Sequence, residues 1–120
     1  MRFAHAIFLT LSLLILSASV LPDQAEARGS ASSIGGKPAR WCGWWMRTQK
    51  GGGPELNLAR NWAKWGRPSG PRVGAVVVWS HHVGMITGRT ASGWVVKSGN
   101  DGGRVRERVR SVSGAVFRVG

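Results

Sequence analysis

The pattern of apolar residues changes in the middle of this chain, and this change is the strongest constraint on its fold. Residues 41–49 carry aromatic side chains at helical spacing, with Trp44 and Trp45 three and four positions after Trp41. Residues 74–79 form a continuous apolar run rich in β-branched side chains, which predicts a buried strand. Helices first and strands afterwards predict an α+β fold, with N-terminal helices packed on a small antiparallel β-sheet.

Two helices are expected before the sheet. The first, over residues 41–49, is ended by Gly-Gly-Gly-Pro at residues 51–54. The second is predicted over residues 56–65, where Gly66 is placed to cap its C-terminus. Residues 67–72 contain two prolines and a glycine, so they are expected to form a loop.

Further strands should follow the buried run. Their predicted ranges are 82–87, 93–97, 104–110 and 115–119. Between the second and third of these, the segment 98–103 is a strong turn signal. The segment 104–110 alternates Val105 and Val109 with arginines, which predicts an edge strand whose charged outer face blocks edge-to-edge association.

The first 27 residues have the pattern of an export signal. Arg2 supplies a positive charge, an apolar run over residues 6–16 follows, and Ala-Glu-Ala at 25–27 is a small-residue cleavage site. The alternative is an uncleaved membrane anchor, although the apolar run is short for a bilayer span. After cleavage, residues 28–40 would form a flexible lead-in, and residues 41–120 the single folded domain of a periplasmic or extracellular protein.

The charge of the chain is strongly unbalanced and restricts its partners. The sequence holds 17 Lys and Arg against 5 Asp and Glu. Such a protein is attracted to polyanions, so an anionic envelope polymer is an expected partner and peripheral membrane contact stays open. An exported chain seldom meets nucleic acid, so none is expected as a partner. No phosphate loop, zinc-ligand spacing or paired carboxylates occur, so no cofactor or metal is predicted.

Cys42 is the one cysteine of the chain, so no disulfide can form within it. Three readings follow: a disulfide to another chain, a reactive thiol, or an inert sulfur buried among tryptophans. Cys42 stands at the predicted start of the first helix, where unpaired backbone N–H groups stabilise a thiolate and can bind an oxyanion. This position makes Cys42 a candidate nucleophile.

Two later segments could complete a nucleophile–base system. His82 opens a predicted strand and could take the thiol proton, and His81 is its rival. Adjacent strand residues point to opposite faces, so we expect only one of the two histidines to meet Cys42. Asn100 or Asp101, after the third strand, could orient the histidine, although Asn-Asp-Gly-Gly is also ordinary turn chemistry.

The tryptophans divide into two predicted groups. Trp62, Trp79 and Trp94 each fit an apolar period and are expected in the core. The three that flank the cysteine are expected to line a substrate groove, and they are Trp41, Trp44 and Trp45.

Four motifs in chain order resemble those of CHAP domains, the cysteine, histidine-dependent amidohydrolases/peptidases related to NlpC-type cell-wall peptidases. They are Trp-Cys-Gly at 41–43, the apolar strand 74–79, His-Val-Gly-x-x-x-Gly at 82–88 and Ser-Gly-Asn at 98–100. The resemblance covers residues 40–119 and implies a papain-like fold.

The resemblance also implies roles for three residues and a substrate. Cys42 falls on the family's nucleophile, His82 on its base and Asn100 on its third polar residue. The implied activity is cleavage of peptide or amide bonds in peptidoglycan by a monomer. The alternative is a non-catalytic cationic protein that binds cell wall or membrane surfaces through Arg and Trp, with a degenerate form of the same fold.

Overall fold

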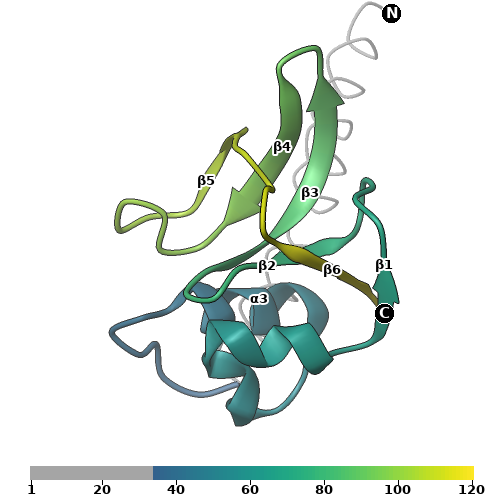
Figure 1. The fold of residues 1–120 in the computed structure, drawn as a ribbon. Helices are drawn as coiled ribbons and strands as arrows, with labels where there is room; N and C mark the ends of the chain where they lie inside the picture. Colours follow the sequence, from purple (N-terminus) through teal and green to yellow (C-terminus); the bar gives the residue numbers. More distant parts are fainter. Residues whose placement is uncertain (1–33) are drawn as a thin grey trace, which may run out of the picture. The chain divides into compact units, whose positions relative to one another are not determined.

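The structure is a computed structural model that describes residues 34–120. The predicted signal sequence, its cleavage site and residues 28–33 of the lead-in lie outside the described residues. The described part is α+β, as predicted: one α-helix and two 3₁₀ helices are followed by six strands (Figure 1). No helix in residues 34–120 is long and apolar enough to cross a membrane.

All six strands join one antiparallel sheet in the order β1-β6-β2-β3-β4-β5. Their bounds are β1 Arg67–Ser69, β2 Val76–Val78, β3 Val83–Thr90, β4 Gly93–Ser98, β5 Arg106–Val109 and β6 Val116–Val119. The predicted strand over residues 82–87 is longer than expected, because a bulge between Ile86 and Gly88 lets β3 continue past Gly88.

The prediction of the first helix is confirmed, and the prediction of the second helix is corrected. The α-helix α3 spans Cys42–Lys50. The predicted second helix is instead two 3₁₀ helices, η1 (Pro54–Asn57) and η2 (Ala59–Lys64). They are separated by Leu58, whose backbone is extended and therefore interrupts the helical path.

The predicted loop over residues 67–72 is wrong for its first residues, which form strand β1. Arg67, Pro68 and Ser69 pair with Val119, Arg118 and Phe117 of β6. Proline is tolerated here because β1 lies at the edge of the sheet. Gly66 turns the chain into β1 with a positive φ of 59°, and a Cβ at this position would collide with the carbonyl oxygen of Val119.

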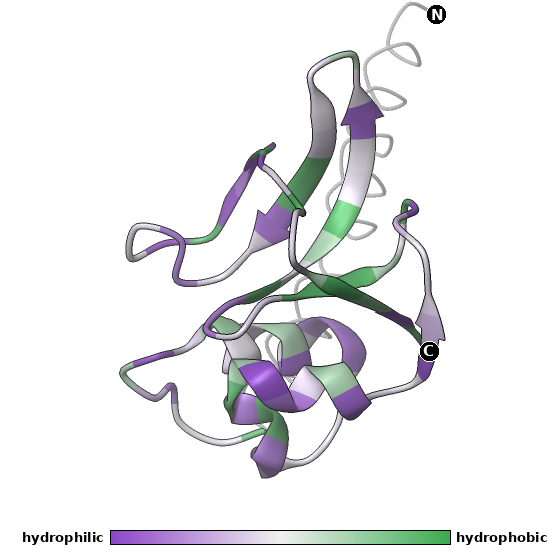
Figure 2. Ribbon diagram, viewed as in Figure 1, coloured by the Kyte–Doolittle hydropathy of each residue, from purple (hydrophilic) through white to green (hydrophobic). Residues whose placement is uncertain are grey.

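Two apolar clusters lie on opposite faces of the sheet. The larger one packs α3, η1 and η2 against β2 and β3, and Trp62 and Met46 in it are 0% exposed. The smaller one is built on Val77, Ile86 and Val96. In Figure 2 apolar residues are concentrated along β2 and most of β6.

The predicted core tryptophans follow these clusters. Trp62 is fully buried in the larger cluster, as predicted. Trp79 and Trp94 are partly buried and pack against the smaller one.

Strand β5 is an edge strand, as predicted, but its charged face is the opposite of the expected one. Val105 and Val109 are exposed, whereas Arg108 and Arg110 are partly covered. Both arginines form ion pairs with the carboxylate of Asp101, and the side chain of Arg108 stays 40% exposed. The prediction failed because alternation separates the two faces of a strand but does not say which face meets a buried counter-ion.

Candidate functional site

Cys42 is the first residue of α3, as expected from its sequence position. No side chain caps this helix end, and its first turn holds no acidic residue. The early backbone N–H groups of the helix therefore remain without a capping side chain beside the thiol. The side chain of Cys42 is held in the larger apolar cluster, and the residue is 5% exposed.

Gly43 allows α3 to approach η1 closely at the point where the thiol sits. A Cβ at this position would collide with the backbone carbonyl oxygens of Leu56 and Asn57. The η1 segment is in turn held by Arg47, whose side chain donates to Asn57 Oδ1 at 2.8 Å and to the carbonyl of Gly52 at 3.1 Å. Backbone contacts and buried hydrogen bonds thus fix the helix tip that carries Cys42.

His82 lies directly before β3, and two side chains orient its ring. Its Nε2 is 2.9 Å from the hydroxyl oxygen of Ser98. The indole of Trp79 lies beside the ring, with centroids 5.9 Å apart and planes inclined by 44°. When Nε2–H donates to Ser98, Nδ1 carries the lone pair, and Nδ1 has no hydrogen-bond partner among residues 34–120. In that tautomer the ring presents a free basic nitrogen.

Sequence reasoning missed Ser98. It is the last residue of β4, is fully buried, and lies beside Gly84 of β3. A Cβ at Gly84 would be only 2.9 Å from that of Ser98, so the glycine makes room for the serine. The signal was present as Gly84 in the His-Val-Gly motif and as Ser98 in the Ser-Gly-Asn motif, but only Asn100 and Asp101 are considered as orienting residues in the sequence analysis.

Neither predicted orienting residue hydrogen-bonds to His82 in the described part of the chain. Asn100 has a positive φ of 53° and lines a cavity with Cys42 and His82. Asp101 instead binds Arg108, with Nε 2.7 Å and Nη2 3.0 Å from its two carboxylate oxygens, and lies 3.8 Å from Arg110. The contact that fixes the imidazole is therefore made by Ser98.

The arginines around Asp101 continue the network to the histidine. The guanidinium of Arg110 lies 4.6 Å above the ring of Trp79, the same ring that flanks His82. Hydrogen bonding from Arg108 holds the pKa of Asp101 below its usual range, so this carboxylate is ionised. Asp101 thereby anchors the two arginines whose charges act on the histidine.

The pKa of His82 is lowered from its ordinary value of 6.5. Burial of the ring is the main cause, the positive charges of Arg110 and Arg108 add to it, and the negative charge of Asp101 opposes it. The imidazole is therefore neutral at pH 7, which is the form that can accept a proton.

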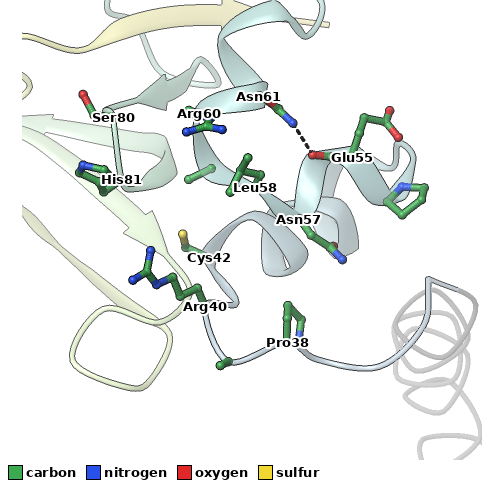
Figure 3. Close-up of a pocket in the computed structure, with 13 residues that line it drawn as sticks. Pro38, Arg40, Cys42, Glu55, Asn57, Leu58, Arg60, Asn61, Ser80 and His81 are labelled. Atoms are coloured by element: carbon green, nitrogen blue, oxygen red, sulfur yellow. Dashed lines mark hydrogen bonds between the residues drawn. The ribbon is translucent and has the colours of Figure 1, made fainter.

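Two cavities meet at Cys42. The smaller, of about 440 Å³, is lined by Arg40, Cys42, His81, His82 and Asn100. The larger, of about 760 Å³, shares the first three of these residues and extends along η1 and η2 (Figure 3). Both histidines precede β3 and line the smaller cavity with Cys42, so the alternation expected of adjacent strand residues does not apply to them.

The predicted tryptophan-lined groove is not found at these cavities. Trp45 is buried in the larger apolar cluster, so its assignment to a substrate groove is wrong. Trp41 and Trp44 pack against the same cluster and line neither cavity. They are held from outside by the lead-in, through Lys37 stacked 4.5 Å from the ring of Trp41 and a hydrogen bond from Trp44 Nε1 to Gly35.

The site thus combines a thiol at a helix start, a neutral imidazole and an amide side chain around one cavity. Within residues 34–120, no hydrogen bond joins the Cys42 sulfur to His82, and such contacts often tighten only when substrate binds. This set of groups is suited to nucleophilic attack on a carbonyl. No family model matches the chain, and comparisons with curated proteins and with solved structures found no similar protein.

Proposed function

We propose that this protein is an exported cysteine hydrolase of papain-like, CHAP-related type that cleaves peptide or amide bonds of peptidoglycan. The observation that carries the proposal is the convergence of Cys42, His82 and Asn100 on one cavity. They come from a helix start, the beginning of a strand and a turn, 58 residues apart at most in the sequence. The neutral state of His82 and its free Nδ1 support its role as the base.

The proposed reaction proceeds in two steps. His82 Nδ1 takes the thiol proton as the Cys42 sulfur attacks the carbonyl carbon, and the same nitrogen then gives that proton to the leaving amine. The resulting thioester is hydrolysed by water, which His82 deprotonates, and the thiol is regenerated. Backbone N–H groups at the uncapped start of α3, including that of Cys42, stabilise the oxyanion. Ser98 holds the imidazole in place, and when Nε2–H donates to its hydroxyl oxygen, Nδ1 is left as the base.

The decisive test compares three purified proteins on isolated peptidoglycan, with release of new amino groups as the measurement. Cys42→Ala and His82→Ala should each lower hydrolysis to background, a loss of about 10³-fold or more. Lys50→Ala, an exposed change at the far end of α3, serves as the control and should retain full activity. Unchanged hydrolysis by Cys42→Ala would refute the proposal.

A cationic binding protein without catalytic activity is the alternative, and the excess of basic residues favours it. It predicts that wall binding persists in Cys42→Ala and disappears at high salt, with no product released by any variant. The same purified proteins answer this question by co-sedimentation with the wall. A disulfide-linked dimer through Cys42 would be seen on a non-reducing gel, whereas the buried position of the sulfur favours a monomer.

A further inference from the structure

The larger cavity has a defined place in the proposed reaction, and this inference rests on the proposed function. Since His82 must protonate the leaving amine, the leaving group lies on the side of Cys42 that faces His82 and Asn100. Those two residues line only the smaller cavity. The acyl part of the substrate must then extend the other way, into the cavity of about 760 Å³ along η1 and η2.

The walls of this acyl-side cavity are mostly apolar, with a few polar groups. Pro38, Ala39, Pro54 and Ala59 contribute small apolar surfaces, and Leu58 is 45% exposed. A large exposed leucine beside a concave site is suited to contact with an apolar part of a ligand. Shape and polarity therefore favour an extended peptide with small side chains.

Two guanidinium groups interrupt this apolar lining. Figure 3 shows Arg60, from η2, and Arg40, from the lead-in, flanking the sulfur of Cys42 in this view. Neither forms an ion pair with any residue of 34–120, whereas Arg108 and Arg110 are bound to Asp101. Unpaired arginines beside an apolar pocket attract a carboxylate, which a guanidinium binds through two parallel hydrogen bonds.

Nearby groups of the protein do not already satisfy these arginines. Glu55 is the one acidic residue that lines the cavity, and its carboxylate points away from the cysteine in Figure 3. Asn61 is engaged with the carbonyl of Glu55, and Asn57 Oδ1 accepts from Arg47. The positive charge at the cavity is thus free to meet a ligand.

We propose that Arg60, assisted by Arg40, binds a carboxylate on the acyl side of the substrate peptide and makes the protein selective for anionic over amidated peptides. The selectivity comes from two cations that line the cavity, in addition to the general attraction of a basic protein for an anionic polymer.

The experiment uses two forms of the same isolated peptidoglycan: the native wall, and a wall whose free carboxyl groups are converted to carboxamides. Hydrolysis by the wild-type protein should be about tenfold slower on the amidated wall, as expected for loss of one charge-assisted pair. Arg60→Gln should be slow on both walls, so its native-to-amidated ratio falls toward one. Arg72→Gln removes an exposed loop arginine outside both cavities and should keep the wild-type ratio.

Binding to the two walls separates this inference from the proposed function. It is measured by co-sedimentation in a Cys42→Ala background, where no bond is cut. Loss of native-over-amidated preference in Arg60→Gln, and not in Arg72→Gln, supports the carboxylate site even if the wild-type protein hydrolyses nothing. If Cys42→Ala alone, with Arg60→Gln and with Arg72→Gln all give the same native-to-amidated binding ratio, the inference is overturned. Hydrolysis by Cys42 in the wild-type protein would not be affected by that result.

Discussion

The two halves of the candidate site are held by different kinds of interaction. Cys42 belongs to a helical layer fixed by apolar packing and by the close backbone approach at Gly43. His82 belongs to the rim of the sheet and is fixed by a hydrogen bond to Ser98 and by contact with the tilted ring of Trp79. Beyond these lie the charges of Arg108, Arg110 and Asp101.

This difference teaches how each half should respond to change. Apolar packing depends weakly on pH and salt but tolerates little added volume. A network of hydrogen bonds and charges tolerates small changes of shape but responds to pH through its titratable members. Substitutions in the helical half should therefore lower activity by unfolding the protein or displacing the thiol of Cys42. Substitutions in the sheet half should lower it by releasing the His82 ring or by changing the pKa of that ring.

The largest effect on the helical half is expected from Gly43→Ala. The new methyl group would meet the carbonyl oxygens of Leu56 and Asn57, so α3 and η1 must move apart. We expect a loss of about 2–3 kcal/mol in the free energy of unfolding, measured by urea denaturation, and loss of most hydrolysis. Gly36→Ala is the matched control, because a Cβ at Gly36 meets open space. A Gly43→Ala protein as stable as this control would contradict the packing account.

The second effect concerns the orientation of the His82 ring in the sheet half. Ser98→Ala removes the hydroxyl that holds this ring, with little change of side-chain volume. Without its hydroxyl partner the His82 ring loses the hydrogen bond at Nε2 that holds its orientation, so kcat should fall about tenfold while KM changes little. The ¹⁵N shifts of the His82 ring should report the change at Nε2, which a merely structural role of Ser98 would not produce. Ser92→Ala, in the exposed β3–β4 turn, should change neither. Full activity in Ser98→Ala would mean that Asn100 or another group orients the ring.

The same contrast explains what could be predicted from the sequence. The helix start at Cys42 and the buried run that became β2 depend on local patterns, so their prediction was close. Strand β1 could not be predicted, because its residues read as a loop and only pairing with distant β6 makes them a strand. Trp45 was misassigned because helical spacing places a residue on a face without showing what covers that face.

The site could be predicted only in part for a related reason. Chain order indicates a cysteine, a histidine and a later polar residue, the resemblance to CHAP domains selects Cys42, His82 and Asn100, and the structure brings these three to one cavity. The role of Ser98 depends on the register of β4 against β3 and on the missing side chain at Gly84. That register passes through a bulge, which spacing in the sequence does not reveal.

The smallest effect, on proton affinity, is expected from Arg110→Gln. The positive charge of Arg110 disfavours the imidazolium, so its removal should raise the pKa of His82 toward 6.5. The acid limb of kcat/KM, which should lie below pH 6.5 in the wild type, should therefore move to higher pH. Arg89→Gln is a matched control, because Arg89 stacks on Trp94 at 4.5 Å as Arg110 does on Trp79 at 4.6 Å.

The lowered pKa of His82 should also make the free energy of unfolding depend on pH. A histidine whose pKa is lower in the folded state is neutral in both states above pH 6.5, and there it costs no stability. As the pH falls below 6.5, the unfolded chain binds a proton that the folded protein does not, so stability declines until the folded pKa is reached. Arg110→Gln should flatten this decline and Arg89→Gln should not. If both variants flatten it equally, loss of the arginine stack rather than the charge beside His82 is responsible.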